Sequence, residues 1–292
     1  MIERHVAPAG GLAGWVNRHA VALVAAGSYL LAWVWWAPLL GRDLGDVGAL
    51  GPGFLVFALA GGLMPSFAAL LWRLLGGRLP PAAREGLGGP LRHPVWLLPV
   101  LALVPAAAVA GIGIQVLLGL RYDLGTVGSR LMIGPLWPLL ASLGEEFAWR
   151  GVLLPLLRVR FGLLKAALLV GLVWGFWHLP ADWIGLKAQG AWFWPQFLLQ
   201  GPVLLTAHSL VLAWIWARSG GRILAALIYH FGITSSAILL GNQIAAAGGA
   251  AFGGNLLGLL PVLALAVPAG IALGLERGEV KDGRPAGDPT AR

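Results

Sequence analysis

Several stretches of this sequence run for about twenty residues or more without a charged side chain. Three of them, at 20–41, 53–72 and 95–120, are strongly apolar throughout. A helix of about 20 apolar residues is long enough to cross the hydrocarbon core of a bilayer. The composition agrees, since 58% of the 292 residues are hydrophobic and only 11% are charged. The chain is therefore predicted to be an all-α, polytopic membrane protein and not a soluble domain.

The remainder of the chain supplies further predicted spans. Residues 131–157 are apolar apart from three charges, 166–180 with their flanks make a shorter span, and 188–217 lack charge. The uncharged run at 223–275 is too long for one helix, and glycines at 248, 249, 253 and 254 are expected to divide it. We predict about eight transmembrane helices. The expected order is a cytoplasmic segment at 1–19, three helices within 20–120, a core of four helices at 131–240, a final helix at 256–275 and a disordered cytoplasmic tail at 276–292.

The positions of lysine and arginine predict the orientation in the membrane. Most of these residues fall in the loops that share a side with both termini, whereas only Arg42, Arg121, Arg130 and Lys187 lie on the other side. By the positive-inside rule, both termini of this cell-membrane protein are expected in the cytoplasm. The charges form no basic stripe, so the expected partner is the lipid bilayer and not nucleic acid. The fifteen tryptophans are expected at the membrane interfaces.

Three ionisable residues interrupt the predicted span at 131–157, namely Glu145, Glu146 and Arg150. A charge at the bilayer centre costs about 2.5 to 3.5 kcal/mol on insertion scales, so such residues usually mark a functional site. Glu146 precedes Arg150 by four residues, which is the favoured orientation for an ion pair on a helix. Glu145 lies roughly 140° around the helix from Arg150. We expect Glu146 and Arg150 to neutralise each other as structural support and Glu145 to be available for chemistry.

Two histidines are expected at the same depth as these glutamates. Counted from the nearest predicted cytoplasmic lysine or arginine at about 1.5 Å per residue, Glu146, His178 and His230 lie roughly 12 to 20 Å into the membrane. This coincidence predicts a common site formed by three spans. His208 is also expected at membrane depth, but it belongs to no motif and is interpreted as structural.

Two histidines and a carboxylate support two kinds of chemistry. Glu145, His178 and His230 could bind a catalytic zinc that keeps a fourth position open for water. Alternatively, Glu145 could act without metal as the general base toward a water while the histidines orient that water and stabilise the oxyanion. The residues leave both routes open, so the predicted cofactor is either zinc or none. A His-Glu-x-x-His helix, the usual soluble zinc-protease motif, is missing from the sequence.

The motifs resemble those of the CPBP family, the intramembrane proteases related to CAAX prenyl endopeptidases of the Rce1 type and to the bacterial Abi proteins. The family's Glu-Glu-x-x-x-Arg motif is matched by Glu145, Glu146 and Arg150. Its aromatic-x-x-x-His motif is matched by Trp174 and His178, with tryptophan where phenylalanine is usual.

The third motif of the family, His-x-x-x-Asn or Asp, is matched at His230 but has Thr234 in its last position. The resemblance covers residues 131–240 and implies a CAAX protease-like intramembrane endopeptidase acting on a peptide or membrane-protein substrate. It implies that Glu145 activates the attacking water with help from His178, while His230 and Thr234 support the oxyanion. A threonine hydroxyl can donate a hydrogen bond as an asparagine amide can, but it is shorter and can instead bond to a carbonyl of its own helix.

A non-enzymatic interpretation is also compatible with these residues. The ion pair and the histidines could simply hold helices together in a catalytically weak or inactive membrane scaffold or partner-binding protein. Thr234 is the residue that favours this alternative. A transporter with a protonatable site is less consistent with the sequence, because the two halves of the chain show no paired repeats.

Overall fold

The computed structural model describes residues 11–41, 57, 60–79, 97–120, 135–240 and 248–275, and every regular element in these ranges is helical. The first part of the predicted segment at 1–19, most of 53–59 and the predicted tail at 276–292 lie outside the described residues. Among the described residues, four helical stretches are long and apolar enough to cross a membrane, namely Ala20–Leu40, Val100–Leu117, Leu179–Arg218 and Gly249–Leu275. The prediction of a helical, multi-pass membrane protein is confirmed, while the number of eight spans stays a prediction.

The N-terminal part of the chain forms α1 (Gly11–Arg18), α2 (Ala20–Leu40), α4 (Met64–Leu74) and α6 (Leu97–Leu117). The central part begins with α8 (Leu136–Ala148), which passes through the π-helical turn η3 (Trp149–Leu153) into α9 (Leu154–Trp177). Within α9, Gly162 has φ 74° and ψ 166°, a conformation that glycine adopts easily and that breaks the helix. This break separates the predicted spans at 131–157 and 166–180.

After α9 the chain runs through a series of short helical elements. These are α10 (Leu179–Leu186), the 3₁₀ turn η4 (Lys187–Trp192), α11 (Phe193–Leu198), the π-helical turn η5 (Leu199–Val203) and α12 (Leu204–Arg218). Pro202 lies inside η5, where its missing N–H disturbs regular helical hydrogen bonding. The predicted span at 188–217 is therefore a broken helix.

The chain ends in two long helices, α13 (Ile223–Leu240) and α14 (Gly248–Leu275). The final helix was expected at 256–275, but it begins at Gly248. Gly253 and Gly254 lie inside α14 and do not interrupt it, in line with the higher frequency of glycine in membrane helices than in soluble ones.

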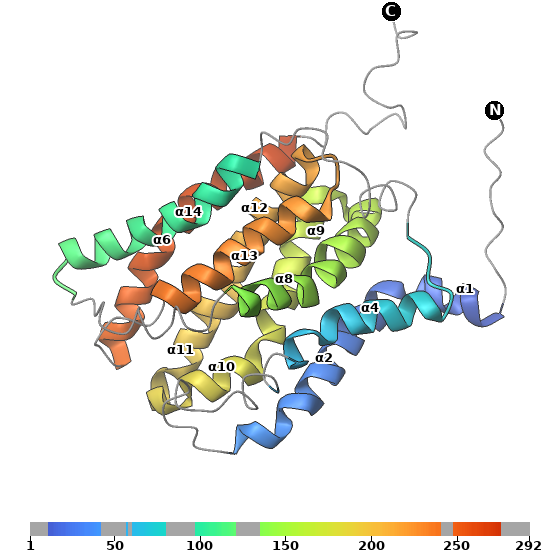
Figure 1. The fold of residues 1–292 in the computed structure, drawn as a ribbon, viewed down its shortest axis with the longest axis horizontal. Coiled ribbons are helices and arrows are strands. Elements are labelled where there is room, and N and C mark those ends of the chain that lie inside the picture. Colours follow the sequence, from blue (N-terminus) through green and yellow to red (C-terminus); the bar gives the residue numbers. More distant parts are fainter. Residues whose placement is uncertain are drawn as a thin grey trace, which may run out of the picture.

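Eight of the described helices form a closed ring of contacts, in which each helix packs against the next (Figure 1). The order is α2, α4, α8, α13, α6, α14, α12 and α9, and α9 returns to contact α2. Close crossings in the bundle depend on glycine, as two examples show. A Cβ atom at Gly144 of α8 would lie 2.6 Å from the carbonyl oxygen of Gly62, and one at Gly175 of α9 would lie 2.5 Å from the Cα of Pro202.

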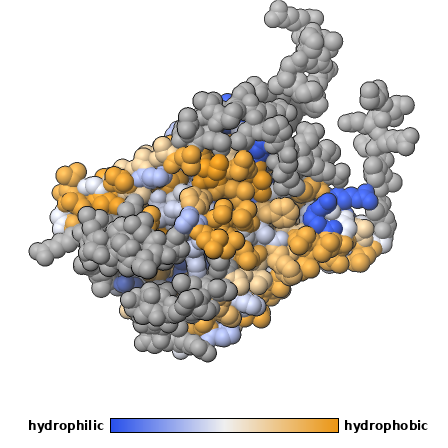
Figure 2. Space-filling model, in the orientation of Figure 1, coloured by the Kyte–Doolittle hydropathy of each residue, from blue (hydrophilic) through white to orange (hydrophobic). Residues whose placement is uncertain are grey.

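The outer surface of the bundle is largely apolar, as Figure 2 shows over much of one face. Large aliphatic side chains such as Val34, Leu117 and Val267 are strongly exposed. In contrast, the charged Glu146 and Arg150 are fully buried. This arrangement, with apolar side chains outside and charged side chains inside, is the one that is stable in a lipid bilayer, because the outer surface contacts hydrocarbon chains and not water.

Candidate active site

The side chain of Glu145 is held at the end of α8 by two buried tryptophans. Its Oε2 accepts a hydrogen bond of 3.2 Å from Nε1 of Trp149, one turn later on the same chain segment, and one of 2.5 Å from Nε1 of Trp174 in α9. The Nε2 atom of His178, at the end of α9, lies 3.9 Å from the same carboxylate oxygen. Glu145 is 4% exposed, whereas the His178 side chain is 27% exposed and so opens toward the surroundings.

The side chain of Glu146 has different partners, because neighbouring residues on a helix point about 100° apart. Its Oε1 accepts hydrogen bonds from Nη1 of Arg150 at 2.7 Å and from Nδ1 of His230 in α13 at 2.8 Å. The Arg150 guanidinium also lies over the Trp174 ring, with Cζ 4.7 Å from the ring centre. The expected pair of Glu146 and Arg150 is therefore present, and His230 joins it.

The structure brings the predicted site residues together as two carboxylate–histidine pairs. Glu145 lies beside His178, and Glu146 is bonded to His230. The Trp174 ring neighbours both histidines, with its centre 6.3 Å from the ring centre of His178 and 5.0 Å from that of His230. The sequence placed Glu145, His178 and His230 in one layer but did not predict that His230 would pair with Glu146.

The charges in this cluster nearly balance. Two carboxylates face one guanidinium, so a single proton on a histidine or on one carboxyl group makes the cluster neutral. Among the described residues, Oε2 of Glu146 and Nε and Nη2 of Arg150 are buried without a hydrogen-bond partner. A buried ion pair of this kind is costly to form and costlier to break on one side, since the remaining charge is left uncompensated.

The predicted zinc ligands do not converge on a common point. In the described ranges, no group of three histidine, aspartate or glutamate side chains is arranged so that it could hold a metal ion. The Oε2 atom of Glu145 already accepts two indole hydrogen bonds, and Nδ1 of His230 is bonded to Glu146. As arranged, these residues do not fit a three-ligand zinc site, and zinc binding stays a prediction.

Thr234 lies one turn after His230 on α13 and is partly exposed. Its hydroxyl makes no hydrogen bond to another residue in the described parts of the chain, so it is not bonded back to its own helix. His208 of α12 is placed differently, with its Nδ1 3.1 Å from the hydroxyl oxygen of Tyr229 in α13. That contact joins two helices and fits the structural role expected for His208.

Tryptophan contributes to this site in a way that the sequence did not predict. Trp149, Trp174 and Trp177 are at most 1% exposed and lie in the protein core, whereas tryptophans were expected at the membrane interfaces. The first two correct that expectation for a physical reason, since their indole N–H groups donate hydrogen bonds to a carboxylate that is buried in the protein. Spacing offered a signal for Trp149, which follows Glu145 by four residues.

The two π-helical turns are a second feature that the sequence did not reveal. Turn η3 contains Arg150 and begins directly after α8, and turn η5 crosses α9 at Gly175, next to Trp174. Wide turns of this kind occur frequently at functional sites, because they redirect side chains within a helix. Both therefore border the elements that carry Glu145 and His178.

The central segment of the chain is similar to known proteins. Residues 128–236 match the family described as type II CAAX prenyl endopeptidase Rce1-like. The CAAX prenyl protease 2 of Methanococcus maripaludis is 30% identical to the chain over 108 residues, which is 35% of this chain and 38% of that protein. The chain thus matches well under half of the relative's length. The segment from 128 to 236 contains all the site residues described above.

Proposed function

We propose, from the premise that residues 128–236 belong to the Rce1-like family of type II CAAX prenyl endopeptidases, that this protein hydrolyses peptide bonds within the membrane. The observation that carries the proposal is the pair of Glu145 and His178. Their carboxylate oxygen and Nε2 lie 3.9 Å apart, too far for a direct hydrogen bond but suitable for a water that bonds to both.

In the proposed reaction, Glu145 acts as the general base. It removes a proton from the water bound between Glu145 and His178, and the resulting hydroxide attacks the carbonyl carbon of the scissile peptide bond. The C–N bond then breaks, and Glu145 passes its proton to the leaving amine. The hydrogen bonds from Trp149 and Trp174 support this role because they fix the carboxylate in one orientation.

The negative oxygen of the tetrahedral intermediate needs hydrogen-bond donors near it. We propose that His230 supplies one, held in place by its Nδ1 bond to Glu146 so that Nε2 faces the substrate. Thr234, one turn away with an unbonded hydroxyl, is the second candidate donor. Arg150 then holds Glu146 in position and does not act on the substrate itself.

The proposed substrate is a prenylated C-terminal peptide, as the names of the matched family and relative suggest. A prenyl chain would hold such a peptide in the bilayer, and the partly exposed His178 marks where the site opens. Consistent with the distribution of lysine and arginine, we propose that both termini face the cytoplasm and that the site lies in the cytoplasmic half of the cell membrane.

The proposal can be tested with the purified full chain in detergent. A farnesylated peptide with a CAAX-type C-terminus and its unfarnesylated copy would be incubated with the protein, and products would be identified by mass spectrometry. We expect cleavage of the farnesylated peptide at a rate that a chelator leaves unchanged. Failure to cleave either peptide would contradict the proposal. If a chelator abolished cleavage and added zinc restored it, the mechanism would require a metal and the metal-free route would be wrong.

A non-enzymatic scaffold is the second candidate function. Thr234 favours it, because the matched motif calls for an asparagine or aspartate at this place and the threonine hydroxyl is shorter than either side chain. A scaffold would retain the fold and the buried ion pair of Glu146 and Arg150 but would cleave no peptide. The same assay therefore separates the two functions.

A further inference from the structure

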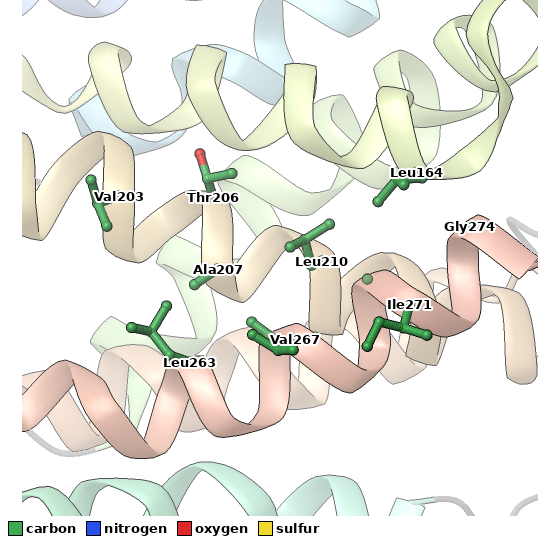
Figure 3. Close-up of a pocket in the computed structure, with 11 residues that line it drawn as sticks. Leu164, Val203, Thr206, Ala207, Leu210, Leu263, Val267, Ile271 and Gly274 are labelled. Carbon is green, nitrogen blue, oxygen red and sulfur yellow. The ribbon is translucent and has the colours of Figure 1, made fainter.

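An apolar groove of about 540 Å³ lies between α12 and α14, with Leu164 of α9 at one end (Figure 3). Its walls are formed largely by aliphatic side chains, including Leu210, Leu263, Val267 and Ile271. Thr206 also borders the groove, but its hydroxyl points toward α9 and lies 2.9 Å from where a Cβ of Gly171 would be. The surface offered by the groove is therefore hydrophobic.

The groove opens to the outside of the bundle and not into the candidate active site. Val203, Val267 and Ile271 are 46%, 59% and 59% exposed, respectively. Because the chain spans a membrane, these side chains face lipid. None of the residues that line the groove belongs to the cluster around Glu145, so the inference is independent of the proposed function.

Two glycines of α14, one turn apart, leave room for the groove. A Cβ atom at Gly270 would lie 3.6 Å from Cδ1 of Leu210, and one at Gly274 would lie 3.5 Å from Cδ2 of Leu164. These are ordinary contacts, so alanine would fit at either position. A leucine at Gly270 would extend beyond that contact and occupy the groove itself.

The length of the groove fits one acyl chain of one leaflet. Along α14, from Leu263 to Gly274, it extends for about 16 Å at a rise of about 1.5 Å per residue. The hydrocarbon core of a bilayer is about 30 Å thick, so this is close to the depth of a single leaflet.

Basic residues gather at the end of the groove where Leu164 and Gly274 lie. Lys165 follows Leu164 directly and is exposed. Arg158 and Arg160, six and four residues before Leu164, are also exposed, as is Arg218 at the end of α12. Arg158 lies over the Trp216 ring at 5.6 Å, which places the start of α9 beside the end of α12. In the described ranges, the acidic side chains are confined to Glu145, Glu146 and Asp182, which lie elsewhere.

We propose that this groove is a binding site for an anionic phospholipid. One acyl chain lies between α12 and α14 along Gly270, and the phosphate-containing head group meets Lys165 at the membrane surface. Lysine suits this position because its aliphatic stem can lie along an apolar surface while the ammonium group reaches the interface. Basic pockets between transmembrane helices bind anionic lipid head groups by this combination of charge and shape.

The full chain, purified in detergent, would be mixed with equal amounts of phosphatidylglycerol and phosphatidylcholine of the same acyl chains. Mass spectrometry of the intact complexes then measures which lipid stays bound. We expect the wild type to retain one phosphatidylglycerol in preference to phosphatidylcholine. Gly270→Leu is expected to lose it, whereas Gly253→Leu, on the same helix with no atom within 4 Å of its added Cβ, is expected to keep it.

A second pair of variants tests the head-group contact without altering the groove. Lys165→Gln is expected to lower the preference for phosphatidylglycerol about fivefold, the typical effect of one basic residue at an anionic surface. Arg18→Gln, an exposed basic residue on α1, should leave the preference unchanged. Equal retention of the two lipids by the wild type would overturn the proposal, as would equal retention of phosphatidylglycerol by Gly270→Leu and Gly253→Leu.

Discussion

The Nδ1 atom of His230 lies 2.8 Å from Oε1 of Glu146, whereas His178 lies beside the other glutamate, Glu145. Two adjacent glutamates thus serve two histidines from different helices. This division follows from helix geometry, because side chains of consecutive residues diverge by about 100° and so meet different neighbours. The catalytic and supporting roles proposed for Glu145 and Glu146 depend on it.

The bond between Glu146 and His230 should be measurable as a coupling in stability. In a double-mutant cycle of Glu146→Gln and His230→Asn, we expect a coupling energy of about 1 to 3 kcal/mol, since contacting buried residues are not additive. The measurement is the free energy of unfolding in mixed detergent micelles.

A cycle of Glu146→Gln with His178→Asn provides the control for that coupling. His178 is paired with Glu145, so the two changes should add within about 0.5 kcal/mol. If both cycles gave the same coupling, the assignment of each histidine to its own glutamate would be wrong.

Trp174 should contribute to catalysis through its indole N–H. Phenylalanine keeps the ring against His230 and Arg150 but removes the donor to Glu145. A hydrogen bond to a charged group is worth about 1.5 to 3 kcal/mol, so Trp174→Phe is expected to reduce kcat by roughly 10- to 100-fold. Steady-state kinetics on the farnesylated peptide would measure the change.

Trp177→Phe is the matched control, because Trp177 is equally buried and donates its indole N–H to the carbonyl oxygen of Ser28, away from the catalytic carboxylate. Both variants should lose a similar amount of stability, but only Trp174→Phe should lose most of its activity. Equal losses of kcat in the two variants would show that the hydrogen bond from Trp174 to Glu145 has no particular importance for catalysis.

Gly175 should be required for the close crossing of α9 and η5. A Cβ atom at this position would lie 2.5 Å from Cα of Pro202, which is backbone and cannot move aside easily. Gly175→Ala is therefore expected to destabilise the protein by about 1 to 3 kcal/mol, the usual cost of overpacking. Thermal unfolding would measure this change. Gly253→Ala is the control, because a Cβ atom there has no atom within 4 Å, and it should leave the stability unchanged or raise it.

Thr234 should respond to substitution as an oxyanion donor would. Removing such a donor typically costs about 2.7 to 4 kcal/mol, so Thr234→Val is expected to lower kcat about 100-fold or more, while Thr234→Asn should match or exceed the wild type. Ser235→Ala, the next residue on the same helix, serves as the control. Unchanged activity in Thr234→Val would show that this hydroxyl takes no part in the reaction.

Much of the architecture could be predicted from the sequence, because an apolar run of about 20 residues has few alternatives to a membrane helix. The pair of Glu146 and Arg150 followed from spacing alone, since the two residues are four apart on one continuous helical segment. The common layer of Glu145, His178 and His230 followed from depth, which depends only on the rise of a helix.

The partners between helices could not be predicted in the same way. Depth does not tell which face of α13 meets α8, so the bond from His230 to Glu146 required the packing of the bundle. The burial of Trp174 was missed because a tryptophan is usually most stable at the interface, and only a buried carboxylate nearby makes the core favourable. The start of α14 at Gly248 was missed because helix packing outweighs the low helix propensity of glycine in a membrane.

The most direct test of the central claim is the rate of peptide cleavage by Glu145→Gln. Glutamine keeps the size and an acceptor oxygen for the indole of Trp174, but it cannot take a proton from water. The purified variant should have an unfolding midpoint close to that of the wild type and no detectable cleavage of the farnesylated peptide, while the wild type cleaves it. Cleavage by Glu145→Gln at the wild-type rate would show that another group activates the water.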